Sequence, residues 1–271
     1  MGLERQPHLK DFYEAFYSAT ESSQAHRQFC EQVFGLDLCQ HGFADLEQLD
    51  LLLKATGLAP SQHALDLGCG SGLITEYLSD RSGANLTGLD YIPRAIEQAR
   101  TRTTAKTERL NFMVGDVNRL ELEPASFDAI LSIDSIYFSE DYDKTIAELK
   151  KALRPGGQMA FLYSQGREPW VPVEQFPRES IRPRRTPLAK ALKANGLSFR
   201  TWNLTQKDYD LAQKRKAVLA ELKSRFEAEG NLFIYENRLG DANGVSQAIE
   251  EGLHARYLYR AFIRGLNRKS D

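Results

Sequence analysis

The spacing of hydrophobic positions along the chain changes near residue 60. Before that point apolar residues recur every three or four positions, over residues 9–34 and again over 43–56, and this spacing predicts helices. From residue 63 onwards, short runs of consecutive apolar residues alternate with helical stretches. Such runs are typical of strands buried on both faces of a parallel sheet. The pattern therefore predicts a helical N-terminal region followed by an α/β domain.

Seven strands are expected in that domain and around it. They are expected at residues 63–67, 85–90, 111–114, 127–133, 158–163, 197–204 and 254–263. Helical spacing predicts the intervening helices at residues 73–79, 94–102, 144–153 and 187–194. Because strand and helix alternate, we expect a Rossmann-like, doubly wound seven-stranded sheet of the α/β class.

The chain divides into four expected parts. Residues 1–60 form an N-terminal helical cap, and residues 61–204 form a cofactor-binding core. Residues 205–252, which carry a helical pattern, are expected to form a lobe inserted between two paired strands. Residues 253–271 supply the final strand and a tail. The proline-rich stretch 164–187 is expected to be an extended loop.

The charges are unevenly distributed along the 271 residues, although the formal net charge is only −2. Residues 1–165 carry 15 basic and 24 acidic side chains, whereas residues 166–271 carry 20 basic and 13 acidic ones. An acidic half suits a cationic ligand and a basic half an anionic one, and two solvated surfaces explain the same charges equally well. The near-neutral total disfavours a dedicated nucleic-acid-binding protein.

The cysteines and the apolar runs bear on the compartment. Cys30, Cys39 and Cys69 are an odd set without the paired spacing of a metal site, so we expect no metal and a reducing compartment. No apolar run approaches the ~20 residues of a membrane helix, and the first residues carry no signal-peptide segment. We therefore expect a cytoplasmic protein without a membrane partner. The oligomeric state is left open.

A glycine-rich loop follows the first strand and opens a helix, with the sequence Asp66-Leu67-Gly68-Cys69-Gly70-Ser71-Gly72. Glycines there permit a tight turn and a close approach of backbone to ligand, and the helix N-terminus offers N–H donors that suit a carboxylate. The spacing G-x-G-x-G differs from the G-x-G-x-x-G of dinucleotide enzymes. Asp66 would repel the phosphates of NAD and attract an amino group.

This segment resembles the first motif of the class I S-adenosylmethionine-dependent methyltransferases. Further segments that resemble motifs of the same family follow in order: Gly88-Leu89-Asp90, Gly115-Asp116-Val117, Phe127–Asp134 and Leu153–Gly157. Together they cover about residues 60–163, and the conjunction is far more specific than any one motif.

The resemblance implies S-adenosylmethionine as cofactor and S-adenosylhomocysteine as product. It implies that Asp90 accepts hydrogen bonds from the ribose hydroxyls and that Asp116 binds the adenine amino group. The expected cofactor-binding residues are Asp66, Gly68, Cys69, Gly70, Gly72, Asp90, Tyr91, Ile92, Gly115, Asp116, Val117, Ile133 and, from the N-terminal helix, Tyr17. Purely structural roles stay open for the acids, which can brace or start turns, and for Tyr17, which can pack on the core.

A second segment, Leu38–Phe43, is similar to the His-Gly-aromatic segment of the branch that methylates quinones, tocopherols, sterols and small amines. The similarity implies that His41 lies near the methionine end of the cofactor. A catalytic base, a hydrogen-bond donor to the cofactor carboxylate and a half-buried structural imidazole remain three open roles for His41. Asp134, Tyr137 and Tyr235 are the expected acceptor contacts, with a solvated loop or core packing as the alternative.

The function that the family resemblance implies is methyl transfer to nitrogen or oxygen of a small molecule, with carbon also open. Methyl transfer from a sulfonium is an in-line displacement, in which the protein positions the acceptor and excludes water. We expect an acceptor that is aromatic, an amine or anionic. The alternative is an RNA or protein methyltransferase, which the basic half favours; the fourth motif lacks an Asn-Pro-Pro-Tyr-like sequence and no RNA-binding module is appended, so nucleic acid is not the expected partner.

Overall fold

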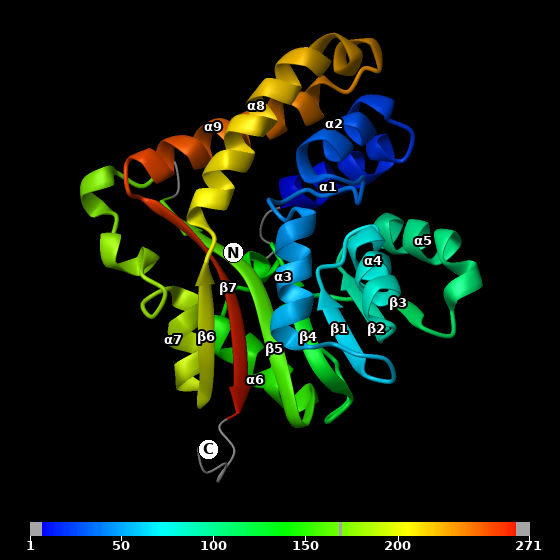
Figure 1. Ribbon diagram of the computed structural model, residues 1–271, viewed down its shortest axis with the longest axis vertical. Coiled ribbons are helices and arrows are strands. Elements are labelled where there is room, and N and C mark those ends of the chain that lie inside the picture. Colours follow the sequence, from blue (N-terminus) through cyan, green and yellow to red (C-terminus); the bar gives the residue numbers. More distant parts are fainter. Residues whose placement is uncertain (1–6, 168–169, 264–271) are drawn as a thin grey trace.

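The computed structural model describes residues 7–167 and 170–263. Its centre is a seven-stranded sheet in the order β3-β2-β1-β4-β5-β7-β6 (Figure 1). The strands are β1 (His63–Leu67), β2 (Asn85–Asp90), β3 (Leu110–Val114), β4 (Phe127–Ile133), β5 (Leu153–Gly166), β6 (Leu197–Asn203) and β7 (His254–Ile263). The first five are parallel, whereas β7 runs antiparallel to both β5 and β6. The Rossmann-like seven-stranded prediction is confirmed, with one reversed strand.

Helices cover both faces of the sheet, as expected for strands that are apolar on both sides. Side chains from α3, α4 and α5 belong to the core on one face, and side chains from α6 and α7 to the core on the other. The helices are α1 (Pro7–Thr20), α2 (Gln24–Phe34), α3 (Leu46–Thr56), α4 (Leu73–Ser82), α5 (Pro93–Arg102), α6 (Tyr142–Ala152), α7 (Pro187–Ala194), α8 (Thr205–Ala228) and α9 (Leu232–Glu250). In these described segments, none combines the length and the apolar character that crossing a membrane requires.

The first predicted helix, residues 9–34, is in fact two helices. The helix is interrupted before Ser23, whose side chain accepts a hydrogen bond from the His26 N–H and so caps the start of α2. The third helix begins at residue 46 rather than 43, because Asp45 caps it in the same way, and it ends at Gly57 as predicted, with φ of 60°. Local capping chemistry thus decides where the cap helices begin.

The α8–α9 hairpin begins after β6 and ends before β7, and all of β6 pairs with residues 257–263 of β7. It packs against α1 and α2 in a separate core rich in phenylalanine, which includes Phe16, Phe29 and Phe226. Figure 1 shows this hairpin and the first two helices together beyond the carboxyl ends of the parallel strands. A helical layer therefore lies over the edge at which Rossmann-like sheets bind ligands.

The segment predicted as an extended loop, residues 164–187, has more structure than expected. The strand β5 continues to Gly166, and two short 3₁₀ helices follow, at Val173–Gln175 and Arg178–Ile181. Two other 3₁₀ turns lie at Thr104–Lys106 and Ile136–Phe138. The expected tail after residue 263 and the first six residues lie outside the described residues.

Candidate functional site

A cavity lies at the carboxyl ends of β1, β2 and β4. Its empty volume is about 1010 Å³, a figure that includes the solvent space at its mouth. The order of the strands reverses between β1 and β4, and this is the position at which open α/β sheets bind ligands. The wall contains most of the residues that the sequence predicted, namely Tyr17, His41, Gly68, Cys69, Gly70, Asp90, Tyr91, Ile92, Gly115, Asp116, Val117, Ile133 and Asp134. Four others, Asp66, Gly72, Tyr137 and Tyr235, are not part of it.

The glycine loop borders the cavity and also contacts the helix α1. Gly68 and Gly70 have positive φ angles of 77° and 55°, which favour glycine. A Cβ atom on Gly70 would lie 2.4 Å from the Tyr17 hydroxyl, so no side chain fits between the loop and α1. The backbone N–H groups of Gly68 and Cys69 both donate to the Leu89 carbonyl oxygen, at 2.7 and 3.1 Å. The loop is thereby fixed against the end of β2.

Asp90 connects the glycine loop to the second strand. Its Oδ2 accepts the Gly70 N–H at 2.7 Å and its Oδ1 accepts the Ile92 N–H at 2.9 Å. Burial raises the pKa of this carboxyl, and the backbone N–H groups of Ile92, Gly70 and Tyr91 oppose the rise. A carboxylate has about four acceptor sites, so Asp90 retains capacity for the hydroxyl groups of a bound ligand.

Asp116 follows β3 and faces the same cavity. Its Oδ1 accepts hydrogen bonds from the backbone and side-chain N–H groups of Asn118, at 2.9 and 3.1 Å. The Asn118 amide also donates to the Phe138 carbonyl oxygen at 3.0 Å, so the turns after β3 and β4 are joined. Asn118 and Phe138 both belong to the wall. Sequence analysis missed them, although Asn118 directly follows the third motif.

Asp66 lies under the glycine loop and outside the cavity wall. It is buried, and its Oδ2 accepts the Thr75 hydroxyl at 2.6 Å, which joins the end of β1 to α4. Burial raises the pKa of Asp66 to about 6. Gly72 is also internal, because a Cβ atom there would lie 2.4 Å from the Phe112 ring. For both residues the geometry favours a structural role, because they support the glycine loop from the side that faces away from the cavity.

The helix α1 supplies two tyrosines to the wall, Tyr13 and Tyr17. Their rings stack with centroids 6.3 Å apart. Burial raises the pKa of the Tyr17 hydroxyl well above its usual range, so it stays protonated. The Gln98 amide donates to the Tyr17 carbonyl oxygen at 2.9 Å and ties α1 to α5. The cap therefore closes one side of the cavity with neutral aromatic side chains.

His41 reaches the cavity from the loop before α3. Its ring makes edge contacts with Phe12, Tyr13 and Phe16, at centroid distances of 5.8, 5.0 and 5.2 Å. Burial, followed by the charges of two arginines, lowers the pKa of His41 well below its usual value, so the imidazole is neutral at pH 7. Its Nε2 is buried without a hydrogen-bond partner among the described residues. A neutral ring with an available nitrogen thus borders the cavity.

Asp134 lies at the end of β4 with a φ of 53°, a strained angle for a residue with a side chain. Arg256 donates two hydrogen bonds to its carboxylate, from Nη1 to Oδ1 at 2.5 Å and from Nη2 to Oδ2 at 2.9 Å. Asp134 Oδ2 also accepts the Phe43 N–H at 2.9 Å, and a Cβ atom on Gly42 would overlap Asp134. Asp134 therefore holds the loop that carries His41, and protein donors occupy both of its oxygens.

Sequence analysis assigned no role to Arg256, which holds the cavity-wall residue Asp134 in place. It is 1% exposed, and its Nε lies 2.8 Å from Gln48 Oε1 and 3.1 Å from Asp208 Oδ1. Burial lowers the pKa of this guanidinium, but Asp134 and Asp208 outweigh burial and raise it above its usual value. Arg256 lies within an aromatic-rich strand, and no short motif indicates its role.

Two predicted acceptor contacts, Tyr137 and Tyr235, lie away from the cavity wall. The Tyr137 hydroxyl lies 3.3 Å from Asp134 Oδ1 and accepts the Ser164 N–H at 2.6 Å, and its ring stacks on Tyr163. Tyr235 packs in the core between cap and lobe, with its ring centroid 6.1 Å from that of Phe226. Their contact with an acceptor stays a prediction.

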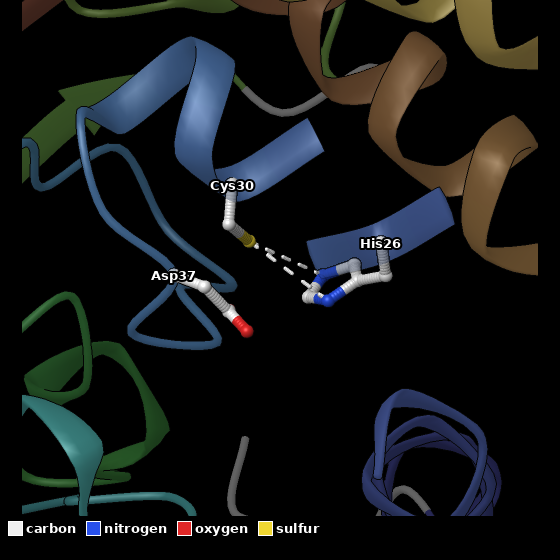
Figure 2. A group of neighbouring side chains, drawn as sticks. All are labelled: His26, Cys30 and Asp37. Atoms are coloured by element: carbon white, nitrogen blue, oxygen red, sulfur yellow. Dashed lines mark hydrogen bonds between the residues drawn. The ribbon is translucent and has the colours of Figure 1, made fainter. Parts of the chain in front are cut away.

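A cluster of metal-ligand side chains lies behind the cavity, in the cap. Figure 2 shows His26 and Cys30 of α2 close to Asp37, and their ligand atoms lie within 4.8 Å of one another. The Arg238 guanidinium lies 3.2 Å from His26 Nε2 and would repel a cation there. Burial raises the pKa of the Cys30 thiol well above its usual value, whereas metals bind the thiolate. The chemistry of these donors does not suit a metal ion.

The core of the chain matches a known family. Residues 65–161 match the family described as methyltransferase domain. An O-methyltransferase of Pyrenophora dematioidea is 34% identical over 104 residues, which is 38% of this chain and 39% of that protein. Phosphoethanolamine N-methyltransferase 2 of Caenorhabditis elegans is 29% identical over 138 residues, which is 50% of this chain and 31% of that protein. The chain thus spans less than half the length of these curated relatives.

A solved structure extends the similarity to the whole fold. Phosphoethanolamine N-methyltransferase 2 of Haemonchus contortus, in complex with phosphomonomethylethanolamine and S-adenosylhomocysteine, superposes with a TM-score of 0.74 at 21% identity. The superposition covers 93% of this chain and 60% of that chain. Residues 65–161 of this chain thus match the methyltransferase domain family, and the fold around them is the one that the solved methyltransferase has.

Proposed function

We propose that this protein is an S-adenosylmethionine-dependent methyltransferase that acts on a small molecule in the cytoplasm. One observation carries the proposal: a single cavity wall unites the glycine loop, Asp90, Asp116 and the His41 loop, which come from four separate stretches of sequence. The family match over residues 65–161 supports the same chemistry. The cap, residues 1–60, and the lobe, residues 205–252, form the acceptor side in this proposal.

The residues of the wall fit the cofactor in size and polarity. Asp90 has acceptor capacity for the ribose hydroxyls, and Asp116 with Val117 offers a carboxylate and an apolar surface for adenine. The glycine loop approaches without side chains at Gly68 and Gly70, so its backbone can contact the methionine portion. When bound, the cofactor supplies an activated methyl group on a sulfonium. The chain itself has only to orient the acceptor and exclude water.

We propose that His41 is the group that takes the proton of the acceptor. Bound S-adenosylmethionine would supply the methyl group, and His41 Nε2 would take the proton that the acceptor oxygen or nitrogen gives up. The neutral state of the ring and the unpartnered Nε2 support this role. Arg238 donates from Nη1 to the His41 carbonyl oxygen at 2.8 Å and keeps the loop in place.

The alternative of an RNA or protein methyltransferase receives less support. Tyr13 and Tyr17 of α1 form part of the wall, and the lobe binds the His41 loop through Arg238. This covered arrangement suits an acceptor small enough to be enclosed. Tight, steeply salt-dependent RNA binding would instead favour the alternative.

The proposal is tested by calorimetry with S-adenosylhomocysteine and with NAD. We expect S-adenosylhomocysteine to bind with a Kd of about 1–100 μM, that is about 5–8 kcal/mol, and NAD not to bind. Asp90→Ala should weaken binding by about 1–3 kcal/mol, because charge-assisted bonds to the ribose are lost. Asp128→Ala, in the same sheet but outside the cavity wall, is the control. Binding of NAD alone, or equal affinity for both variants, would refute the assignment.

A further inference from the structure

Buried polar atoms without a hydrogen-bond partner gather at one place, between α2, α8, α9 and the His41 loop. Among the residues that the structure describes, six such atoms belong to four neighbouring side chains, His41, Arg215, Asn237 and Arg238. Folded proteins satisfy nearly all their buried polar groups, so a concentration of unsatisfied ones calls for a physical explanation. We call these four residues the lobe cluster.

Arg215, in the middle of α8, is the most unusual member of the lobe cluster. It is fully buried, yet none of its three guanidinium nitrogens makes a hydrogen bond to a described residue. The Asp241 carboxylate lies 3.6 Å from its Nη2, beyond hydrogen-bond distance, and the guanidinium lies 4.1 Å from the centre of the Phe43 ring. Burial lowers the pKa of Arg215 to about 10, so the group stays charged at pH 7. An arginine offers five N–H donors.

Arg238, on α9, adds a second buried guanidinium. It donates from Nη1 to the His41 carbonyl oxygen and from Nη2 to that of Gln40, while its Nε has no partner among the described residues. His26 lies beside it and is neutral, because burial and the two arginines lower its pKa well below the usual value. The described part of the lobe cluster thus holds two cations, and the carboxylates that act on Arg215 are the partly exposed Asp241 and, less strongly, Asp208, which pairs with Arg256.

The remaining members of the lobe cluster are acceptors that connect it to the cavity. Asn237 Oδ1 and His41 Nε2 are both buried and neither makes a hydrogen bond of standard geometry to a described residue, although the Asn237 side chain lies close enough to the His41 ring to raise its pKa. His41 also belongs to the cavity wall. The donors of Arg215 and Arg238 are therefore separated from the cavity by one short loop, which both arginines contact through His41 or Phe43.

We propose that the lobe cluster binds the anionic group of the methyl acceptor, with Arg215 and the Arg238 Nε as donors to a carboxylate or phosphate, while Asn237 and His41 accept from its hydroxyl or amino group. The substrate class is then a small molecule with an anion at one end and an oxygen or nitrogen nucleophile at the other. A fork of guanidinium donors matches a carboxylate or phosphate in shape as well as charge. This inference rests on the proposed function.

Two arginines of the proline-rich segment, in contrast, are exposed and paired with a carboxylate. Arg182 and Arg185, in the proline-rich segment, are more than 60% exposed and pair with Glu179 at 2.8 and 3.6 Å. Exposed ion pairs contribute little and leave no buried donor unsatisfied. The excess of basic residues after residue 165 therefore does not by itself locate the anion.

The test measures binding of inorganic phosphate and of acetate at constant ionic strength, with sodium chloride as the reference salt. The protein is saturated with S-adenosylhomocysteine, and Tm is followed against anion concentration. We expect saturable stabilisation by phosphate or acetate, and the anion that binds more tightly identifies the group that the acceptor carries. Arg215→Met should lower that anion affinity at least about tenfold, because a charge-assisted pair is lost. Arg200→Met, an exposed arginine on β6, should leave it unchanged.

Two outcomes would overturn the inference: phosphate and acetate acting no differently from chloride on the wild-type protein, or equal anion affinity in the wild-type protein and Arg215→Met. Calorimetry with S-adenosylhomocysteine on the same samples separates the two proposals, since loss of that binding counts against the proposed function instead. Should Arg215→Met not fold, Arg215→Lys keeps the buried charge and loses the fork. It should still lower anion affinity, by a smaller factor, and unchanged affinity there would equally overturn the inference.

Discussion

The two sides of the cavity are built in different ways. On the cofactor side, the contacts are made at the ends of adjacent strands, as between Gly70 and Asp90, which are 20 positions apart. On the acceptor side, they join distant parts of the chain: Arg256 and Asp134 are 122 positions apart, and Arg238 and His41 are 197 apart. The cofactor side is thus a property of local sequence, whereas the acceptor side exists only once cap, core and lobe have assembled.

Breaking the ion pairs of Arg256 with Asp134 and Asp208 should have the largest effect, because both pairs are buried on the acceptor side. Arg256→Met leaves Asp134 and Asp208 buried without their cation, which should cost about 3–5 kcal/mol of unfolding free energy in urea denaturation.

Arg260→Met, on the same strand, is the matched control. Arg260 is only partly buried and donates to Gln158, so we expect a loss below about 1 kcal/mol. A similar loss of unfolding free energy in both variants would mean that the ion pairs of Arg256 have no special importance for the acceptor side.

Substitution of His41 tests the acceptor side alone. His41→Gln should lower turnover about 10²-fold, because the proton acceptor is removed, with S-adenosylhomocysteine affinity unchanged. The assay is mass spectrometry of a metabolite extract incubated with a labelled methyl donor. His63→Gln, a histidine on β1 outside the cavity wall, is the control. If affinity falls and turnover of the saturated enzyme does not, His41 is a cofactor ligand.

Asp66 tests the cofactor side with the smallest expected effect. Its pKa of about 6 exceeds the usual 3.8, so the native state binds the proton more tightly and stability falls as pH rises between about 4 and 6. Asp66→Asn should therefore raise the unfolding free energy at pH 7 by about 1–2 kcal/mol. The shift itself corresponds to about 3 kcal/mol, and burial of the new amide N–H groups offsets part of it.

The measurement for Asp66 is urea denaturation at pH 4 and pH 7. The gain should be present at pH 7 and nearly absent at pH 4, where the aspartate is largely protonated in the native state. Thr75→Ser, which keeps the hydroxyl partner, is the control and should show no such pH dependence. Weakened binding of S-adenosylhomocysteine by Asp66→Asn would show instead that Asp66 is a cofactor ligand.

The sequence predicted those parts of the molecule whose physical cause is local. Consecutive apolar residues define the strands, and a glycine loop that opens a helix locates the cavity, so Gly70, Asp90 and Asp116 follow from residues within a short distance of one another. The error at this level has a local cause as well, because capping by Ser23 divides the predicted helix 9–34. The contact of Asp66 with the cofactor stays a prediction, and in the structure its Oδ2 accepts the Thr75 hydroxyl.

The residues of the acceptor side could not be predicted from the sequence, because tertiary packing determines their roles. Arg256 lies among aromatic residues of an ordinary-looking strand, and Arg215 occupies a helix with many charged positions. Nothing in their neighbours along the chain distinguishes them from solvated arginines. Tyr235, a candidate acceptor contact because of its aromatic side chain, packs against the core between cap and lobe, and its contact with an acceptor stays a prediction.

The placement of the α8–α9 hairpin has a consequence for how such a protein diversifies. Its two ends are attached to adjacent, hydrogen-bonded strands, with Asn203 paired to Tyr257 at the junction. A hairpin of other length or sequence can be grafted there without changing the register of the sheet. Such an exchange replaces Arg215 and Arg238 together and leaves Gly70 and Asp90 untouched, so under the two proposals it would change the substrate preference in one step and keep the methyl donor.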